Sequence, residues 1–273
     1  MLLRIEHTTS YKYSAPVFAE PHHLYFYPVN RSYLQLLSFD LQVLPVPTGL
    51  ALRVDIENNP YHQCWFDGMI NSMSIAVKLE METTPFNFLD FLIEDNPKTD
   101  HDAAIQLYLN PRMTLSSNVH RWILSLKRSS EANAIAFLGR LCQEIHDGWT
   151  HTISYASQLR DPSDCFEDKS GSCRDLSWMM IEMLREQKIP ARFVSGYCHN
   201  PELEEGHELH AWVEAWVAGA GWIGLDPSSG LFTTADYISV AASYHPANTL
   251  PVQGSYRGKA TSKLETSVRI SVL

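Results

Sequence analysis

Gly171-Ser172-Cys173-Arg174-Asp175 is the stretch around which the rest of the chain is organised. The run after it is apolar with the spacing of a helix that buries one face, at Leu176, Met179, Met180, Met183 and Leu184. Pro190 ends this helix, so Cys173 is expected at or just before its first turn. The free N–H groups and partial positive charge of a helix N-terminus favour the reactive thiolate over the thiol. Cys173 is therefore a candidate nucleophile, and a small buried apolar side chain is the alternative.

A nucleophilic thiol needs a base and a group that orients the base. Residues 210–217, His-Ala-Trp-Val-Glu-Ala-Trp-Val, alternate in the manner of a strand. Ala-Gly-Ala-Gly at 218–221 predicts a hairpin turn, followed by a second strand that Pro227 ends. Antiparallel pairing centred on residue 218 would bring His210 opposite Asp226, with Cβ atoms about 4.5–5.5 Å apart. A slip of one residue would put the two on opposite faces.

Four motifs in this order resemble the transglutaminase-like superfamily, specifically its bacterial branch whose members are described as cysteine proteases. They are Gly-Ser-Cys-Arg-Asp (171–175), Ile-Pro-Ala-Arg-Phe-Val-Ser-Gly-Tyr (189–197), His-Ala-Trp-Val-Glu-Ala (210–215) and Gly-Trp-Ile-Gly-Leu-Asp-Pro (221–227). The resemblance implies a catalytic triad of Cys173 as nucleophile, His210 as general base and acid, and Asp226 as the residue that orients His210. The residue patterns alone indicate the same three roles.

The reaction expected from this resemblance is cysteine-dependent acyl transfer on amide bonds through a thioester acyl-enzyme. Hydrolysis of peptides or amides is the expected outcome. A protein-glutamine transglutaminase that uses an amine acceptor is one alternative, and a non-catalytic binding module on a decayed core is another. Transglutaminase relatives use an upstream aromatic residue near the oxyanion. Trp149 or Tyr155 could take that role here, and aromatic packing is the competing interpretation.

The predicted fold class is α+β. Residues 1–84 consist of strand-like runs separated by Pro and Asn-Asn-Pro, which predicts an N-terminal β-sandwich. The motif Ile-Glu-His-Thr-Thr-Ser-Tyr-Lys-Tyr (5–13) is similar to the β domain that accompanies the bacterial branch. Where that family usually has Leu-Arg-Pro-Arg, this chain has Phe-Tyr-Pro-Val at 26–29, so the role of that arginine is not carried over.

Residues 85–130 are expected to form a bridging segment, with an apolar patch at 85–92 against the second domain and short helices at 101–108 and 118–126. Residues 131–273 are expected to form a transglutaminase-like (papain-like) catalytic domain of helices packed on an antiparallel sheet. After Asp226-Pro227 the chain is expected to form loops, and an alternating run at 264–272 predicts a closing strand.

The composition restricts the partners. A formal net charge of −10 makes nucleic acid and anionic membrane surfaces poor partners. A protein or peptide substrate is what the resemblance implies. The first residues lack the apolar core of a signal peptide, and the five cysteines include no CxxC pair, which together favour a cytoplasmic protein with reduced thiols.

No cofactor is expected. A metal site formed by Cys198, His199, His207 and His210 is the remaining alternative. The substrate and the oligomeric state stay open.

Overall fold

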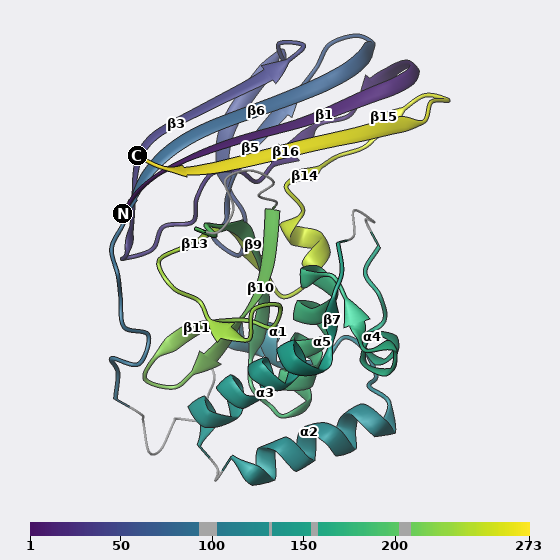
Figure 1. Ribbon diagram of the computed structural model, residues 1–273. Coiled ribbons are helices and arrows are strands. Elements are labelled where there is room, and N and C mark those ends of the chain that lie inside the picture. Colours follow the sequence, from purple (N-terminus) through teal and green to yellow (C-terminus); the bar gives the residue numbers. More distant parts are fainter. Residues whose placement is uncertain (93–102, 131–132, 154–157, 202–208) are drawn as a thin grey trace.

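The computed structural model describes residues 1–92, 103–130, 133–153, 158–201 and 209–273. A layer of long strands lies across a body in which helices pack beside a further sheet (Figure 1). Helices and antiparallel sheets occur together, which confirms the predicted α+β class. No helix in the described ranges is both long and apolar enough to cross a lipid bilayer.

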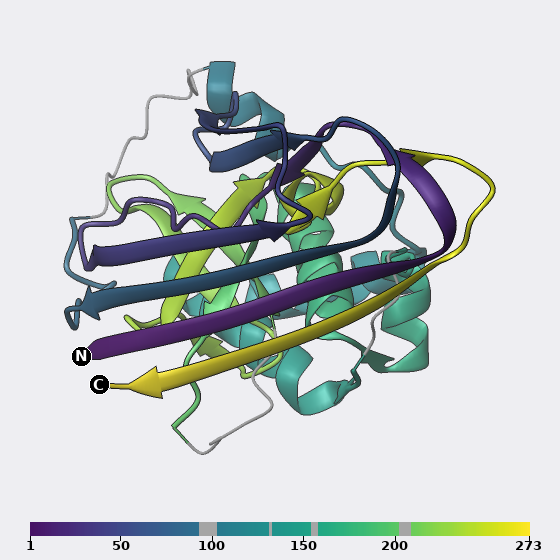
Figure 2. The ribbon, with the colours of Figure 1, turned by 90° about the horizontal axis from the view of Figure 1, so that it is seen from above.

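The strand layer joins the two ends of the described chain. It has the order β15-β1-β6-β3, and β16 pairs along β1 as well. Its strands are β1 (Leu2–Ala19), β3 (Leu34–Leu44), β6 (Ile70–Thr83), β15 (Tyr256–Arg257) and β16 (Ser262–Val272). The β1–β16 ladder runs from Leu3 opposite Val272 to Tyr13 opposite Ser262, so the chain ends lie side by side at one corner (Figure 2).

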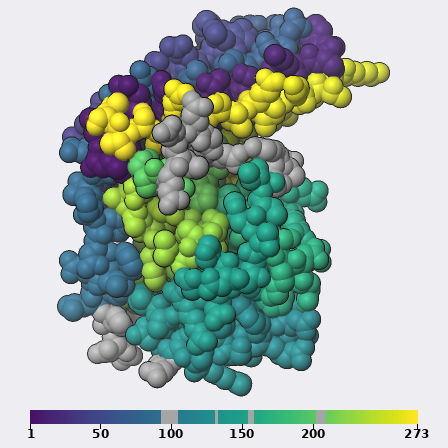
Figure 3. Space-filling model, viewed as in Figure 1, coloured from purple at the N-terminus to yellow at the C-terminus, as the bar shows by residue number. Residues whose placement is uncertain are grey.

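The predicted closing strand is therefore present, and it completes the sheet formed by residues 2–83. The predicted boundaries at residues 84 and 130 stay predictions. In the space-filling view, the strand layer extends beyond the helical body beneath it, at β1 and β16 (Figure 3).

A smaller sheet shares a hydrophobic core with the strand layer. It has the order β14-β2-β5-β4, with β2 (His22–Leu24), β4 (Gly49–Val54), β5 (Pro60–Trp65) and β14 (Val252–Gln253). Ile5 and Leu79 of the strand layer pack in one cluster with Leu24 and Cys64 of the smaller sheet. Tyr197 of the helical body belongs to the same cluster, so the N-terminal residues and the body are packed together.

The helical body is built on an antiparallel sheet of order β12-β11-β10-β9-β13. Its strands are β9 (Ala191–Cys198), β10 (Leu209–Val217), β11 (Gly221–Asp226), β12 (Leu231–Phe232) and β13 (Tyr237–Ser243). The helices are α1 (Ala103–Leu109), α2 (Ser117–Ser129), α3 (Ala134–Gly148), α4 (Pro162–Asp168) and α5 (Cys173–Glu186), with the 3-10 helix η1 (Pro246–Thr249). Leu141 of α3, Leu176 of α5 and Val213 of β10 share one core, and Phe88 of the predicted apolar patch packs against it.

Two segments differ from the prediction. The helix α4 was not predicted from the sequence. Asp161 caps it: its Oδ1 accepts a hydrogen bond from Ser163 N at 2.8 Å, and Pro162 occupies the first turn. The loops expected after Asp226 contain β13, which pairs with β9. The side chains of β13 are buried along its whole length, so this strand lacks the alternation that reveals a half-buried strand.

A fully buried ion pair anchors α5. Glu182 Oε1 accepts a hydrogen bond from Arg185 Nη1 at 2.8 Å, and both side chains have no exposed surface. Glu182 Oε2 also accepts hydrogen bonds from the backbone N–H groups of Arg112 and Met113, at 2.6 and 2.7 Å. The pair therefore ties the helix that begins at Cys173 to the segment between α1 and α2.

Replacing Glu182 by alanine is expected to lower the free energy of unfolding by about 3–5 kcal/mol, because Arg185 would stay buried without its countercharge. Urea denaturation followed by far-UV circular dichroism measures this loss. Lys263→Ala, which breaks an exposed ion pair with Glu265, should leave the midpoint unchanged and serves as the control. Equal midpoints for Glu182→Ala and the unsubstituted protein would contradict the expectation.

Candidate active site

Cys173 is the first residue of α5, and the two residues around it form a capping box. Ser172 is the N-cap, and Asp175 Oδ2 accepts hydrogen bonds from Ser172 N at 3.0 Å and from Ser172 Oγ at 2.7 Å. Arg160 N donates to the other oxygen of Asp175 at 3.1 Å. Asp175 therefore has the structural role expected of a first-turn carboxylate, and the thiol of Cys173 is placed at the positive end of the helix.

The hairpin brings His210 and Asp226 together, but with a register that differs from the prediction. Val213 pairs with Leu225 and Val217 with Gly221, so the ladder is centred on residue 219. Continued by one step, it puts Asp226 opposite Trp212. The predicted direct pairing is wrong by two residues, yet an even offset keeps His210 and Asp226 on the same face. His210 Nε2 lies 2.7 Å from Asp226 Oδ2.

Asp226 is buried and held ionised by its neighbours. Besides the contact with His210, Oδ2 accepts a hydrogen bond from Tyr237 OH at 2.8 Å, and Oδ1 accepts from Ser228 N at 2.9 Å and Ser228 Oγ at 2.6 Å. Burial alone would raise the pKa of Asp226, but the charge of His210 and these hydrogen bonds hold it well below its usual range. Burial raises the pKa of Tyr237, which therefore stays a donor at neutral pH.

Neither Ser228 nor Tyr237 was singled out from the sequence. Ser228 could have been found, because an aspartate commonly accepts a hydrogen bond from the backbone two residues onward. Tyr237 could not, because it approaches Asp226 only through the pairing of β13 with β9.

The thiol of Cys173 contacts the imidazoles of His210 and His151. Burial would raise the pKa of Cys173, but hydrogen bonds with His151 and His210 and the charge of His210 lower it to about 6. Burial lowers the pKa of His210, but the charge and hydrogen bond of Asp226 and the contact with Cys173 raise it well above its usual value. The site therefore favours a thiolate beside a protonated imidazole.

The other cysteines have the opposite shift. Burial raises the pKa of Cys198 to about 11, that of Cys64 to about 11 and that of Cys165 to about 12, and it also raises the pKa of Cys142. All five cysteines lie in the described part of the chain, so Cys173 is the one whose environment activates it.

Trp149, one of the two proposed oxyanion donors, is used elsewhere. Its indole Nε1 donates to Cys165 O at 3.0 Å, and its ring packs against Trp122 and Phe166 with Lys169 Nζ 3.4 Å from its centroid. This is the packing role that was the competing interpretation. Tyr155 lies outside the described residues.

A buried carboxylate in the His-Ala-Trp-Val-Glu-Ala motif supports the strand that carries His210. Glu214 pairs with Arg31 Nη2 at 2.5 Å and with Arg192 Nη2 at 2.6 Å. Burial would raise the pKa of Glu214, but the two arginines hold it below its usual value. Arg31 comes from the loop between β2 and β3, so an arginine just after the segment 26–29 connects the N-terminal residues to β10.

The metal alternative involves Cys198, His199 and His210, and His207, which lies outside the described residues. Among the residues that the structure describes, no group of three or more His, Cys, Asp or Glu side chains could hold a metal ion. His199 Nδ1 lies 3.5 Å from Asp236 Oδ1 instead.

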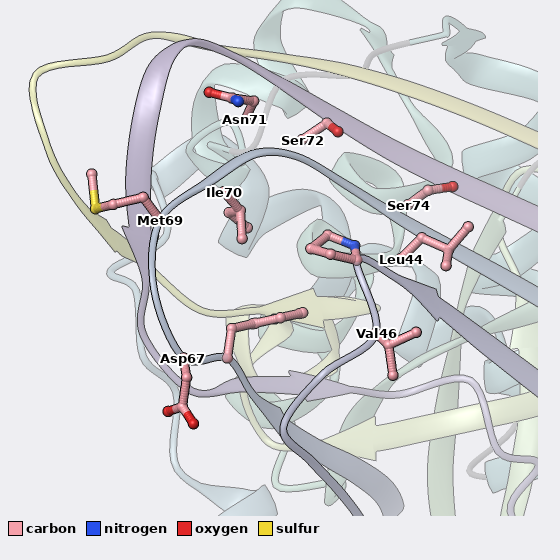
Figure 4. Close-up of a pocket in the computed structure, with 10 residues that line it drawn as sticks. Leu44, Val46, Asp67, Met69, Ile70, Asn71, Ser72 and Ser74 are labelled. Carbon is pink, nitrogen blue, oxygen red and sulfur yellow. The ribbon is translucent and has the colours of Figure 1, made fainter.

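A separate cavity lies beside the end of β3 and the start of β6 (Figure 4). Its labelled lining residues are Leu44, Val46, Asp67, Met69, Ile70, Asn71, Ser72 and Ser74. Cys173, His210 and Asp226 do not line it.

Comparisons with known proteins agree with the motifs. Residues 125–227 match the model of the transglutaminase-like superfamily, and residues 3–82 match that of the bacterial transglutaminase-like N-terminal region. Residues 125–227 therefore belong to the transglutaminase-like superfamily, and residues 3–82 to the bacterial transglutaminase-like N-terminal region. This confirms the resemblance seen in the sequence.

Individual relatives match parts of the chain. An uncharacterized protein of Mycobacterium leprae is 33% identical over 117 residues, which are 40% of this chain and 40% of that protein. A protein-glutamine gamma-glutamyltransferase of Pseudomonas aeruginosa is 32% identical over 111 residues, which are 37% of this chain and 17% of that enzyme. The match thus spans less than half of the length of either relative.

A solved structure from Cytophaga hutchinsonii, described as a candidate cysteine protease, has the same fold. It superposes with a TM-score of 0.74 over 99% of this chain and 90% of that chain, at 17% sequence identity. Membership of the superfamily supports cysteine-based acyl transfer as the general class of chemistry.

Proposed function

We propose that the protein is a cysteine-dependent enzyme that hydrolyses peptide or amide bonds through a thioester, with Cys173, His210 and Asp226 as its triad. The observation that carries the proposal is the 2.7 Å contact between His210 Nε2 and Asp226 Oδ2, with His210 also in hydrogen-bond contact with the Cys173 thiol. A nucleophile in contact with its base, and an orienting carboxylate in contact with that base, are the requirements of covalent catalysis.

The geometry supports a definite path for the proton. Because Nε2 of His210 is bonded to Asp226, Nδ1 is the ring nitrogen left for Cys173. The thiol proton passes to Nδ1, and the thiolate attacks the carbonyl carbon of the amide. Backbone N–H groups at the start of α5 hold the oxyanion, at about 2.7–4 kcal/mol per donor in other enzymes. When the C–N bond breaks, the leaving amine takes the proton from His210.

The second half of the cycle releases the acyl group from sulfur. Water loses a proton to His210 and attacks the thioester carbonyl, and the C–S bond then breaks to return the Cys173 thiolate and a carboxylic acid. A primary amine in place of water would give a new amide. Part of this chain is similar to part of the Pseudomonas glutamyltransferase. Transglutamination is therefore tested as the alternative to hydrolysis.

Product analysis separates the two outcomes. A glutamine-containing peptide is incubated with the enzyme in the presence and absence of a primary amine, and the products are identified by mass spectrometry. The free acid is expected as the main product under both conditions. An amine adduct as the main product would replace hydrolysis by transglutamination. No turnover, combined with an unreactive Cys173, would favour the binding module on a decayed core.

The rate of Cys173 alkylation by limiting iodoacetamide should rise with pH to a plateau, with an apparent pKa of about 6. The thiolate is the reacting species, so the rate is lost as the pH falls through this value. Intact-mass spectrometry with peptide mapping, between about pH 5 and about pH 9, measures the profile. Cys198 in the same sample is the internal control, because its pKa of about 11 predicts slow reaction throughout. An apparent pKa near the free value of about 8.5 would contradict an activated thiol.

The cytoplasmic location expected from the sequence belongs to the same proposal. Fractionation of cells that express the chain tests it, and recovery with the periplasmic or membrane fraction would overturn it.

A further inference from the structure

His151 lies in a short strand that is fixed beside the start of α5. β7 (Thr150–His151) pairs in parallel with β8 (Ser170–Gly171), and His151 is the partner of Gly171. Thr150 N donates to Lys169 O at 2.8 Å and Thr152 N donates to Gly171 O at 2.9 Å, so hydrogen bonds flank His151 on both sides. Its Cα partner is thus two residues before Cys173.

The neighbouring residue Trp149 holds this strand in place. Its buried ring and its hydrogen bond to Cys165 O, at 3.0 Å, attach the end of α3 to α4. The histidine two residues later is exposed. An exposed imidazole contributes little to the hydrophobic core. The backbone that carries this imidazole is hydrogen-bonded on both sides of His151, and it holds the side chain beside the thiol.

The groups that His151 faces are the reacting groups of the proposed triad. Its ring is in hydrogen-bond contact with the Cys173 thiol on α5, and it lies within electrostatic reach of His210 on β10 and Asp226 on β11. The contact with Cys173 raises the pKa of His151, while the partial burial of its ring and the charge of His210 oppose the rise. The thiol therefore contacts two imidazoles, those of His151 and His210.

We infer that His151 is a further catalytic residue, which donates a hydrogen bond to the Cys173 thiolate from the solvent-exposed side of the site. The inference rests on the proposed function, because it assigns a role at the same sulfur. No proton is transferred by His151 in this role: His210 takes the thiol proton, and the His151 N–H stabilises the charge that remains on sulfur.

His210 and His151 differ in the groups that hold them in place. His210 is paired with Asp226, which keeps it in place as the proton acceptor. His151 is held by backbone pairing and is open to solvent, as expected of a residue that meets the substrate.

Two substitutions test the inference through the alkylation profile of Cys173, which needs no substrate. His151→Phe keeps a ring but removes the donor, and should raise the apparent pKa of Cys173 by about one unit toward the free value. At pH 6 the thiolate fraction, and with it the alkylation rate, should then fall about fivefold. His151→Gln keeps an N–H donor and should give a smaller shift. In the amide assay, kcat/KM should fall most at acidic pH.

His120→Gln is the matched control, because His120 is exposed on α2 and faces Glu186; its profile should equal that of the unsubstituted protein. Circular dichroism verifies that each variant is folded. An unchanged Cys173 profile in His151→Phe would overturn the role of His151 while leaving the proposed triad intact. Equal shifts in the Phe and Gln variants would overturn the hydrogen-bond donor role. If the unsubstituted protein itself titrates near the free value, the proposed function fails instead.

Discussion

Replacing Cys173 by alanine is expected to abolish amide turnover and leave the fold intact. The substitution removes the sulfur that forms the thioester, and neither His210 nor His151 replaces it as a nucleophile in the proposed mechanism. The fold should survive because Ser172 and Asp175 supply the cap of α5, and the ion pair between Glu182 and Arg185 anchors the helix further along.

The measurement is release of product from a peptide amide, with far-UV circular dichroism and the midpoint of urea denaturation as tests of folding. Cys198→Ala is the matched control, because it removes a thiol at the end of β9 whose pKa is raised to about 11. Full turnover in Cys173→Ala would remove the nucleophile from the proposal. Loss of turnover in both variants, restored by added zinc in the Cys198 variant, would favour the metal alternative.

Asp226→Asn is expected to lower kcat by about 10³–10⁴-fold, the range seen when the orienting carboxylate of other triads is replaced by an amide. The asparagine keeps the size of Asp226 but loses its negative charge, and its NH2 group cannot accept the hydrogen bond that His210 Nε2 donates. His210 would then lose the interaction that raises its pKa, and the thiolate would lose its charged partner.

Two readouts test this expectation together. The kcat should fall, and the apparent pKa of Cys173 alkylation should rise from about 6. Asp236→Asn is the control, because Asp236 precedes β13 and faces His199 at 3.5 Å rather than His210. A normal kcat in Asp226→Asn would show that Asp226 does not orient the base.

The parts of the fold that were predicted are those with a local signal. The apolar spacing after Cys173 located α5, and alternation on either side of the Ala-Gly turn located β10 and β11. The face shared by His210 and Asp226 followed from the period of two, although the register was off by two residues. An even error of this kind preserves the face, which is why the two side chains could be brought together from the sequence.

What could not be predicted depends on pairing over long distances. β16 lies beside β1, and its alternation shows a strand without showing which strand it joins. Tyr237 reaches Asp226 because β13 pairs with β9, and His151 reaches Cys173 because β7 pairs with β8. A strand of two residues has no period to detect, so nothing in the sequence distinguished His151 from its neighbours.

The position of β16 constrains the order in which the protein can be assembled during synthesis. β1 has β6 on one side and β16 on the other. A nascent chain that has produced β1 to β6 therefore has a long open edge at β1, in addition to the one at β3, and β1 is covered only when residues 262–272 have been made. Open strand edges pair with other chains, so during this interval the uncovered edge of β1 is an additional site at which the nascent chain can aggregate.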